Sequence, residues 1–255
     1  MGWGEILTVL GAGLGAGVVM ASVGGGSLVS FPLLLGIGLS PLVANVCNNV
    51  GLVPGGASAS FGYRRELAGR RDLVLRVAAT SALGAVVGAG LLLRLPSATF
   101  EEVVPFLVLA SATLIGLQPA VSSWLRHRSG AGPATSRESM GPGLSALSAL
   151  LGVYGGYFGA AQGVLLMGVL GLGLDLGLQV VNGLKNVAVL AANVVASIVF
   201  AVYAPLDWGV VGLLAGGSVV GGWAGAHLGR RLPPAVFRGV VVLVGYAVGL
   251  RLLIG

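Results

Sequence analysis

Ten apolar stretches, separated by short polar loops, make up most of this sequence of 255 residues. An α-helix needs about 20 apolar residues to cross a bilayer, and most of these stretches approach that length. Only 9% of the residues are charged, whereas a typical soluble domain carries about 25%. A chain with so few charges cannot build a water-facing surface. The sequence therefore predicts an all-α, multi-pass protein of the cell membrane.

The apolar stretches form two sets of five. In the first half of the chain the predicted helical segments are residues 4–23, 28–39, 42–61, 73–93 and 103–121. In the second half they are residues 144–158, 164–174, 179–203, 208–228 and 236–254. The second segment of each half is too short to cross a bilayer. This predicts short or broken helices, of a re-entrant kind, at the start of each half.

A polar stretch separates the two halves. Residues 122–143 are rich in Ser, Gly and Arg and contain Pro133 and Pro142. Such a composition is typical of a flexible connection. We therefore predict a first membrane repeat over residues 1–121, a cytoplasmic linker over residues 122–143 and a second membrane repeat over residues 144–255.

The positive charges are concentrated in three loops, which hold most of the 14 basic residues. These are Arg64, Arg65, Arg70, Arg71 and Arg76, then Arg126, Arg128 and Arg137, and then Arg230, Arg231 and Arg238. Loops rich in Lys and Arg face the cytoplasm. The pattern therefore predicts which loops are cytoplasmic and places both termini outside. It also accounts for the net charge of +6, so the expected partner is the lipid bilayer and not a nucleic acid.

The two halves share an internal repeat. The string Arg-Leu-Pro-Ser-Ala-Thr-Phe from Arg94 matches Arg-Leu-Pro-Pro-Ala-Val-Phe from Arg231, 137 residues later. The same offset pairs Asn45 with Asn182. Equivalent loops have opposite charge bias, so equivalent segments face opposite sides of the membrane. This predicts an inverted-topology repeat, an architecture of many secondary transporters, which bind substrate near the midplane between discontinuous helices.

Polar side chains recur on one face of the third segment of each half. Residues at i, i+3 and i+4 share a helix face, and polar groups in hydrocarbon usually face the bundle interior. The residues with this spacing are Asn45, Asn48 and Asn49 in the first half and Asn182, Lys185 and Asn186 in the second. Two interpretations remain open. The amides hydrogen-bond neighbouring helices, or they bind a substrate.

Lys185 is the strongest single indication of a binding site, because it is the only lysine in the chain and lies well inside its segment. A cation at the centre of a transmembrane helix costs about 2.5–3.5 kcal/mol on insertion scales. A bound anion would offset that cost. The alternatives are a side chain that extends to the cytoplasmic interface and an ion pair with Asp175 in the preceding loop.

Glycine-rich strings lie between the first two segments of each half, at residues 22–27 and 155–163. Glycines let backbone N–H groups approach a ligand, and helix N-termini favour anions. The candidate substrate-binding residues in these strings are Gly24, Gly25, Gly26, Ser27 and Gln162. The alternative is tight helix packing, which glycine also serves.

Other features exclude several kinds of function. One cysteine and two histidines provide no metal cluster, and no glycine run is followed by Lys-Ser or Lys-Thr as in a nucleotide-binding loop. We therefore expect no metal, no cofactor, no catalytic residue and no enzymatic activity. A set of glycines spaced by four is predicted to serve helix packing, within the chain or in a homodimer. They are Gly217, Gly221, Gly225 and Gly229.

Residues 24–35, their degenerate copy at residues 155–170 and the third segments with their Asn and Lys residues resemble the TauE/SafE sulfite exporter family of membrane permeases. The resemblance extends from Gly13 to Leu253. It implies transport of small sulfur-containing anions, such as sulfite or an organosulfonate like sulfoacetate. We therefore expect a secondary transporter that exports such anions by alternating access, with one half rocking against the other. The alternative is an anion channel, or a permease for another small anion such as thiosulfate or sulfate.

Overall fold

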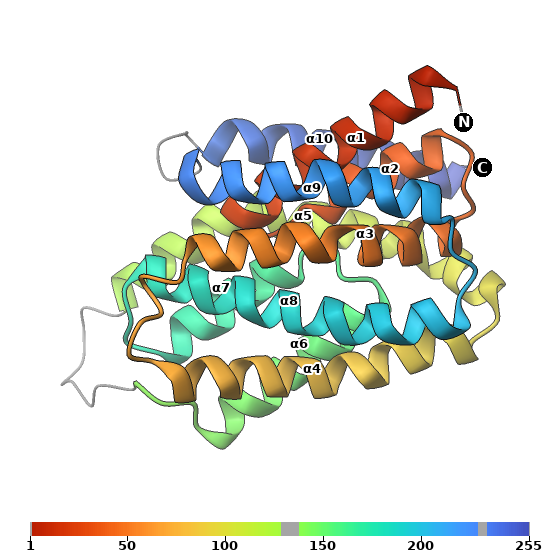
Figure 1. Cartoon of the computed structure of the whole chain (residues 1–255). Coiled ribbons are helices and arrows are strands. Elements are labelled where there is room, and N and C mark those ends of the chain that lie inside the picture. Colours follow the sequence, from red (N-terminus) through yellow and green to blue (C-terminus); the bar gives the residue numbers. More distant parts are fainter. Residues whose placement is uncertain (1, 129–137, 229–233, 255) are drawn as a thin grey trace.

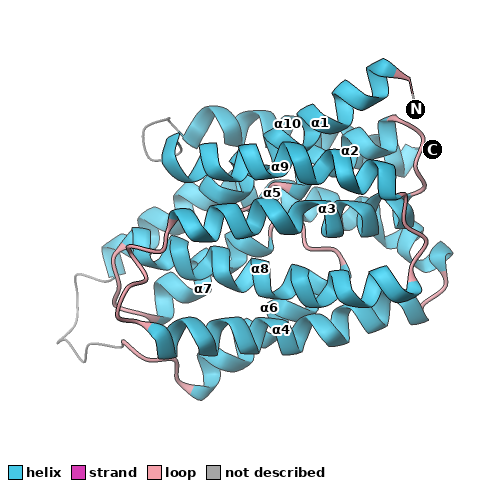
Figure 2. Cartoon of the chain, viewed as in Figure 1, coloured by secondary structure: helices cyan, strands magenta, loops and turns pink. Residues whose placement is uncertain are grey.

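The computed structural model describes residues 2–128, 138–228 and 234–254. Within these ranges the chain forms ten α-helices joined by loops, and Figure 2 shows no strand among them. The first half contains α1 (Trp3–Ser22), α2 (Ser27–Gly36), α3 (Pro41–Gly62), α4 (Arg71–Arg94) and α5 (Ser97–Arg128). The second half contains α6 (Pro142–Tyr157), α7 (Gln162–Gly173), α8 (Leu178–Tyr203), α9 (Trp208–Leu228) and α10 (Pro234–Ile254). The predicted all-α architecture with five segments per half is confirmed.

Five of the described helices are long and apolar enough to cross a membrane, namely α1, α4, α5 over Ser97–Ala120, α8 and α9. Helix α3 has 22 residues but carries three asparagines. Helices α2 and α7 have only 10 and 12 residues, so neither crosses a bilayer alone. The short second segment of each half is therefore confirmed.

The central connection begins later than the sequence predicts. Helix α5 continues past Val121 to Arg128, because no glycine or proline occurs between Ala120 and Gly130 to stop it. Helix α6 begins at Pro142, a favoured residue for a first helical turn. Residues 129–137 and 229–233 lie outside the described residues, and with them the predicted cytoplasmic positions of Arg137, Arg230 and Arg231 and the predicted packing role of Gly229.

The helices lie side by side in one elongated bundle, and both chain termini are at the same end of it (Figure 1). The α4–α5 and α8–α9 loops are at that end as well. At the second loop, Asp207 Oδ1 accepts hydrogen bonds from the backbone N–H groups of Gly209 and Val210 at 2.9 and 3.1 Å and so caps α9. The α3–α4 loop, with Arg64, Arg65 and Arg70, lies at the opposite end, hereafter the arginine-rich end.

Helices from the two halves interleave. Helix α1 packs along α9, and α4 packs along α6, so each close pair takes one helix from each half. Glycine permits these approaches: a Cβ on Gly17 of α1 would lie 2.6 Å from the Ser218 carbonyl oxygen of α9. Gly217, Gly221 and Gly225 likewise face the α1 backbone, so these three serve packing within the chain, as predicted.

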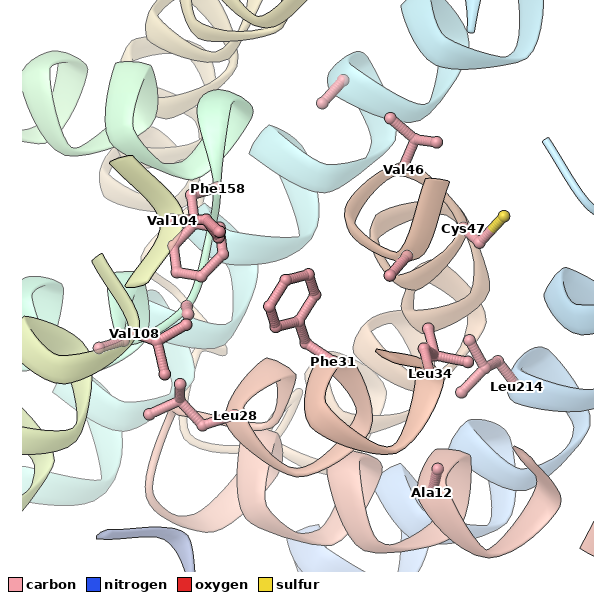
Figure 3. Close-up of a cluster of buried hydrophobic side chains, with 14 of the residues drawn as sticks. Ala12, Leu28, Phe31, Leu34, Val46, Cys47, Val104, Val108, Phe158 and Leu214 are labelled. Atoms are coloured by element: carbon pink, nitrogen blue, oxygen red, sulfur yellow. The ribbon is translucent and has the colours of Figure 1, made fainter. Parts of the chain in front are cut away.

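Aromatic side chains pack in the interior between α2 and the end of α6 (Figure 3). Phe31 of α2 faces Phe158, which follows α6, with ring centroids 5.5 Å apart and planes at 88°. Both rings are buried, and Phe100 of α5 packs against Phe158 as well. This edge-to-face arrangement ties α2, α5 and the end of α6 together.

Candidate functional site

Two interruptions of the helices meet inside the bundle. The first break, residues 23–26, joins α1 to α2, and the second break, residues 158–161, joins α6 to α7. Gly24 and Ala161 both have positive φ, +100° and +61°, and stand at the same offset as Arg94 and Arg231. A Cβ on Gly163 would lie 2.7 Å from the Gly24 carbonyl oxygen. The start of α7 is therefore in direct backbone contact with the first break.

Side chains of α8 bind backbone carbonyls at the C-terminal end of α1, beside the first break. Lys185 Nζ donates a hydrogen bond to the Met20 carbonyl at 3.2 Å. Asn186 Nδ2 donates to the Ala21 carbonyl at 3.5 Å. The last carbonyls of a helix lack intrahelical partners and form the negative end of its dipole. Two of the three predicted site residues of α8, Lys185 and Asn186, therefore converge on a point of negative potential.

Lys185 is buried in the protein and does not extend to the interface, since only 1% of its surface is exposed. Asp175, the acidic residue nearest before it in the sequence, is exposed in the α7–α8 loop. Among the buried side chains that the structure describes, Lys185 is the only one of the Asp, Glu, Lys and Arg residues. Its Nζ donates to a neutral carbonyl.

The second break is held by neutral groups. Asn45 Nδ2 of α3 donates to the Tyr157 carbonyl at 3.0 Å. The Ala160 carbonyl accepts from Ser111 Oγ of α5 at 3.2 Å and from the hydroxyl of Tyr154. Tyr157 stands at the constant 137-residue offset from Met20, so side chains from a third segment bind the equivalent carbonyl at both breaks.

The remaining asparagines join helices to one another. Asn49 Nδ2 donates to Asn193 Oδ1 of α8 at 3.4 Å. Asn182 Nδ2 donates to the Tyr63 hydroxyl, at the end of α3, at 2.7 Å. Asn48 Oδ1 accepts from the Ser30 hydroxyl of α2. At these three positions the geometry favours the helix-joining interpretation.

The glycine-string residues fall around the two breaks. Gly25 faces Ile115 of α5, and Gly26 faces the Ala16 carbonyl of α1. Ser27 begins α2 and is half-buried. Gln162 begins α7, is fully buried, and directs Nε2 toward Ser81 Oγ of α4 at 3.3 Å. The structure thus brings Lys185, Asn186 and the first glycine string together, and it places Asn45 and Gln162 at the second break.

Sequence reasoning did not single out the polar groups of α5. Gln118 Nε2 donates to the Val23 carbonyl of the first break at 3.3 Å, while Ser111 and Tyr154 bind the second. A glutamine inside an apolar span is itself a signal of function that would have found Gln118. For metal binding, the described residues contain no group of three or more His, Cys, Asp or Glu side chains close enough to hold an ion.

An all-helical bundle with five candidate membrane spans, and with two interrupted helix pairs that meet in its interior, defines a multi-pass membrane transporter. The chain belongs to the sulfite exporter TauE/SafE family, whose pattern matches residues 9–252. This assignment indicates a transporter of the cell membrane and not an enzyme.

The similar proteins carry transporter names. The chain is 31% identical to the probable membrane transporter protein ORF9 of Sinorhizobium over 244 residues, which is 93% of this chain and 88% of that protein. It is 25% identical to a probable membrane transporter protein of Haemophilus influenzae over 236 residues, with 92% and 89% of the two chains covered. The probable membrane transporter protein YfcA of Escherichia coli K12 is 28% identical over 149 residues, 58% of this chain and 52% of that one. No solved structure matches the chain.

Proposed function

We propose that this protein is a secondary transporter that exports small sulfur-containing anions, sulfite or an organosulfonate such as sulfoacetate, by alternating access. The observation that carries the proposal is the buried lysine, Lys185, at the C-terminal end of α1. The family assignment supports the sulfur-containing substrate class. A monoanion that leaves a cell with a negative interior gains about 2.3 kcal/mol per 100 mV, so the membrane potential favours export.

The charge of Lys185 is incompletely balanced by the protein. Placing a cation at the membrane centre costs about 2.5–3.5 kcal/mol. A helix C-terminus returns about 0.3–1 kcal/mol, and up to about 2 kcal/mol in partly buried geometries. The described buried residues include no Asp or Glu to supply the rest. A substrate anion beside Nζ would do so, and the bond to Met20 uses only one of the three N–H donors of the ammonium group.

Further donors surround the same region. Helices α2 and α7 begin beside the breaks, where their dipoles are positive and attract an anion, while several of their first N–H groups, such as those of Leu28 and Val164, already donate to carbonyls of the breaks. The amides of Asn45 and Asn186 each use one N–H on a helix-end carbonyl and retain a second. An oxyanion with several acceptor oxygens is the ligand chemistry that such a set of donors fits.

We further propose that the two halves are inverted-topology repeats. Two correspondences at the 137-residue offset support this. Gly24 and Ala161 share positive φ, and side chains of α8 and α3 bind the carbonyls of Met20 and Tyr157. Transporters built in this way place substrate where the repeats meet. Here that region is the contact between Gly24 and Gly163.

The test is efflux of labelled sulfite from proteoliposomes, with wild-type protein beside Lys185→Met. We expect the variant to lose at least about 100-fold in rate, because the substrate loses its counter-charge, while it still elutes as a folded protein in detergent. Arg251→Met is the matched control, since Arg251 is an exposed basic residue of α10; we expect its rate to stay near that of the wild type. Equal rates for wild type and Lys185→Met would make Lys185 a helix cap only.

Alternating access has its own test. A carrier shows counterflow, in which unlabelled sulfite inside the vesicles drives uptake of labelled sulfite against its gradient, whereas an anion channel does not. We expect counterflow that saturates with sulfite concentration. Efflux without counterflow would favour the channel, and absence of transport of any sulfur anion would overturn the proposed substrate.

A further inference from the structure

Helix α5 runs past both breaks and binds each of them with one polar side chain. Ser111 and Gln118 lie two turns apart on it, and their acceptors are the carbonyls of Ala160 and Val23. Between them, the Ile115 side chain occupies the space that a Cβ on Gly25 would need. This face of α5 is therefore fitted closely to the interrupted segments.

The hydrogen-bonding groups around Ser111 are all paired with one another. The hydroxyls of Ser111 and Tyr154 are 2.8 Å apart, and both contact the Ala160 carbonyl. Each hydroxyl supplies one proton, and the carbonyl has two lone pairs that can accept them. Nothing in this cluster requires a further partner.

The contacts of Gln118 are incomplete. Its Nε2 donates to the Val23 carbonyl, while its Oε1 is buried and has no hydrogen-bond partner among the described residues. The orientation of this amide is fixed by chemistry, because turning it over would place Oε1 against the Val23 carbonyl, an acceptor against an acceptor. A buried acceptor without a partner is rare in proteins and destabilising, so it calls for a ligand or a water molecule.

The carbonyls that Gln118 and Lys185 bind lie at the same helix end. Lys185 binds the Met20 carbonyl and Gln118 binds the Val23 carbonyl, and these carbonyls are three residues apart at the end of α1. One side of the first break therefore offers positive N–H donors from α8, and another offers an acceptor from α5. An anion with acceptor atoms alone satisfies the first group and leaves Gln118 Oε1 unpaired.

We infer that Gln118 is a specificity-determining residue, whose Oε1 accepts a hydrogen bond from a substrate that is an anion and also carries an O–H or N–H donor. The inference rests on the proposed anion site at Lys185. The preferred ligands are then protonated monoanions and sulfonates with a hydroxyl or amino group. Sites built to bind a substrate O–H discriminate strongly against analogues that lack it, because their own polar group is left unpaired.

The test compares two ligands of equal charge, ethanesulfonate and hydroxyethanesulfonate, which differ by one hydroxyl group. Their dissociation constants are measured by calorimetry on the full-length protein in nanodiscs. We expect the wild type to bind hydroxyethanesulfonate about tenfold or more tightly. In Gln118→Met, which keeps the length of the side chain and removes its polar atoms, we expect the ratio to fall to about one.

The control variant is Ser111→Ala, on the same helix but in the fully paired cluster, and we expect it to keep the wild-type ratio of affinities. Equal binding of the two sulfonates by the wild type would overturn the inference. This measurement uses only the wild-type protein, so it does not depend on whether a variant folds. It is overturned as well if the preference persists in Gln118→Met, or if neither sulfonate binds. Lys185→Met separates the two proposals: loss of binding of both ligands there supports the anion site, whatever the outcome at Gln118.

Discussion

The two breaks occupy equivalent places in the two halves but are built from different chemistry. At the first, a lysine and amides bind the carbonyls, and Gly24 takes the left-handed conformation. At the second, amide and hydroxyl groups bind the carbonyls, and Ala161 takes that conformation with its methyl group in place. The position that is Lys185 in the second half is Asn48 in the first. One copy of the motif thus carries the lysine, while the other is neutral and lined by aromatic rings.

This difference indicates a division of labour. At the charged break the residue equivalent to Phe158 is Ala21, and the large side chain that packs on its glycines is Ile115 of α5. The neutral break is surrounded by the rings of Phe31, Phe100 and Phe158. We interpret the first break as the part that recognises an anion and the second as the part that gives the pair its rigidity. Substitutions that make one break resemble the other test this interpretation.

The largest effect on stability is expected from Phe158→Ala, which gives the second break the side chain of the first. Removing a buried phenylalanine costs about 3–5 kcal/mol in the free energy of unfolding, because the cavity does not close fully. Denaturant unfolding in detergent micelles measures the loss. Phe106→Ala on α5, where the ring is 60% exposed, is the control and is expected to change little. Similar losses in the free energy of unfolding for the two variants would show that the ring of Phe158 contributes no special packing at the second break.

An intermediate effect is expected from Gly163→Ala, which forces the breaks apart. The added Cβ meets the backbone of Gly24, which cannot rotate away as a side chain can. We expect a loss of about 1–3 kcal/mol in the free energy of unfolding, as for overpacked interiors. Gly11→Ala in α1, where nothing lies within 4 Å of the new atom, is the control and is expected to be neutral or stabilising. An unchanged stability of Gly163→Ala would mean that the breaks are not in firm contact.

The smallest effect is expected from Ala161→Gly, which copies Gly24 into the second break. A non-glycine residue at positive φ carries about 1–2 kcal/mol of strain, and glycine relieves it. Part of this gain is offset by the greater freedom of the unfolded chain and by the loss of a fully buried methyl group, so we expect stabilisation of about 1 kcal/mol or less. The methyl group of the neighbouring Ala160 is equally buried, but Ala160 does not have positive φ, so Ala160→Gly relieves no strain and should destabilise. A melting temperature lowered equally by both variants would argue against strain at Ala161.

Much of the fold was predictable because apolar length is a local property. The number of helices, the short second helix of each half and the packing glycines of α9 follow from runs and spacings in the printed sequence. The end of α5 was placed too early, because a polar composition was taken as a linker although it contains no helix-breaking residue before Gly130.

The site was predictable as a set of residues but not as a set of contacts. The pattern that places Asn45, Lys185 and Asn186 on interior helix faces was visible in the sequence. Their acceptors are backbone carbonyls of remote helices, as in the bond from Lys185 to Met20, and no side-chain pattern marks a carbonyl. Gln118 was missed because attention went to polar residues that recur at helical spacing, whereas Gln118 stands alone and its acceptor is a carbonyl of a remote helix.

The interleaving of α1 with α9 and of α4 with α6 has a consequence for biosynthesis. Helix α1 is among the first parts of the chain to be made, and the glycine-lined surface it packs against is among the last. During translation the surface of α1 that packs against α9 therefore remains unpaired, in lipid or against an insertion factor, until α9 has been synthesised and inserted. We expect neither half, expressed alone, to acquire its native helix pairing, and co-expressed halves to recover it by exchanging helices.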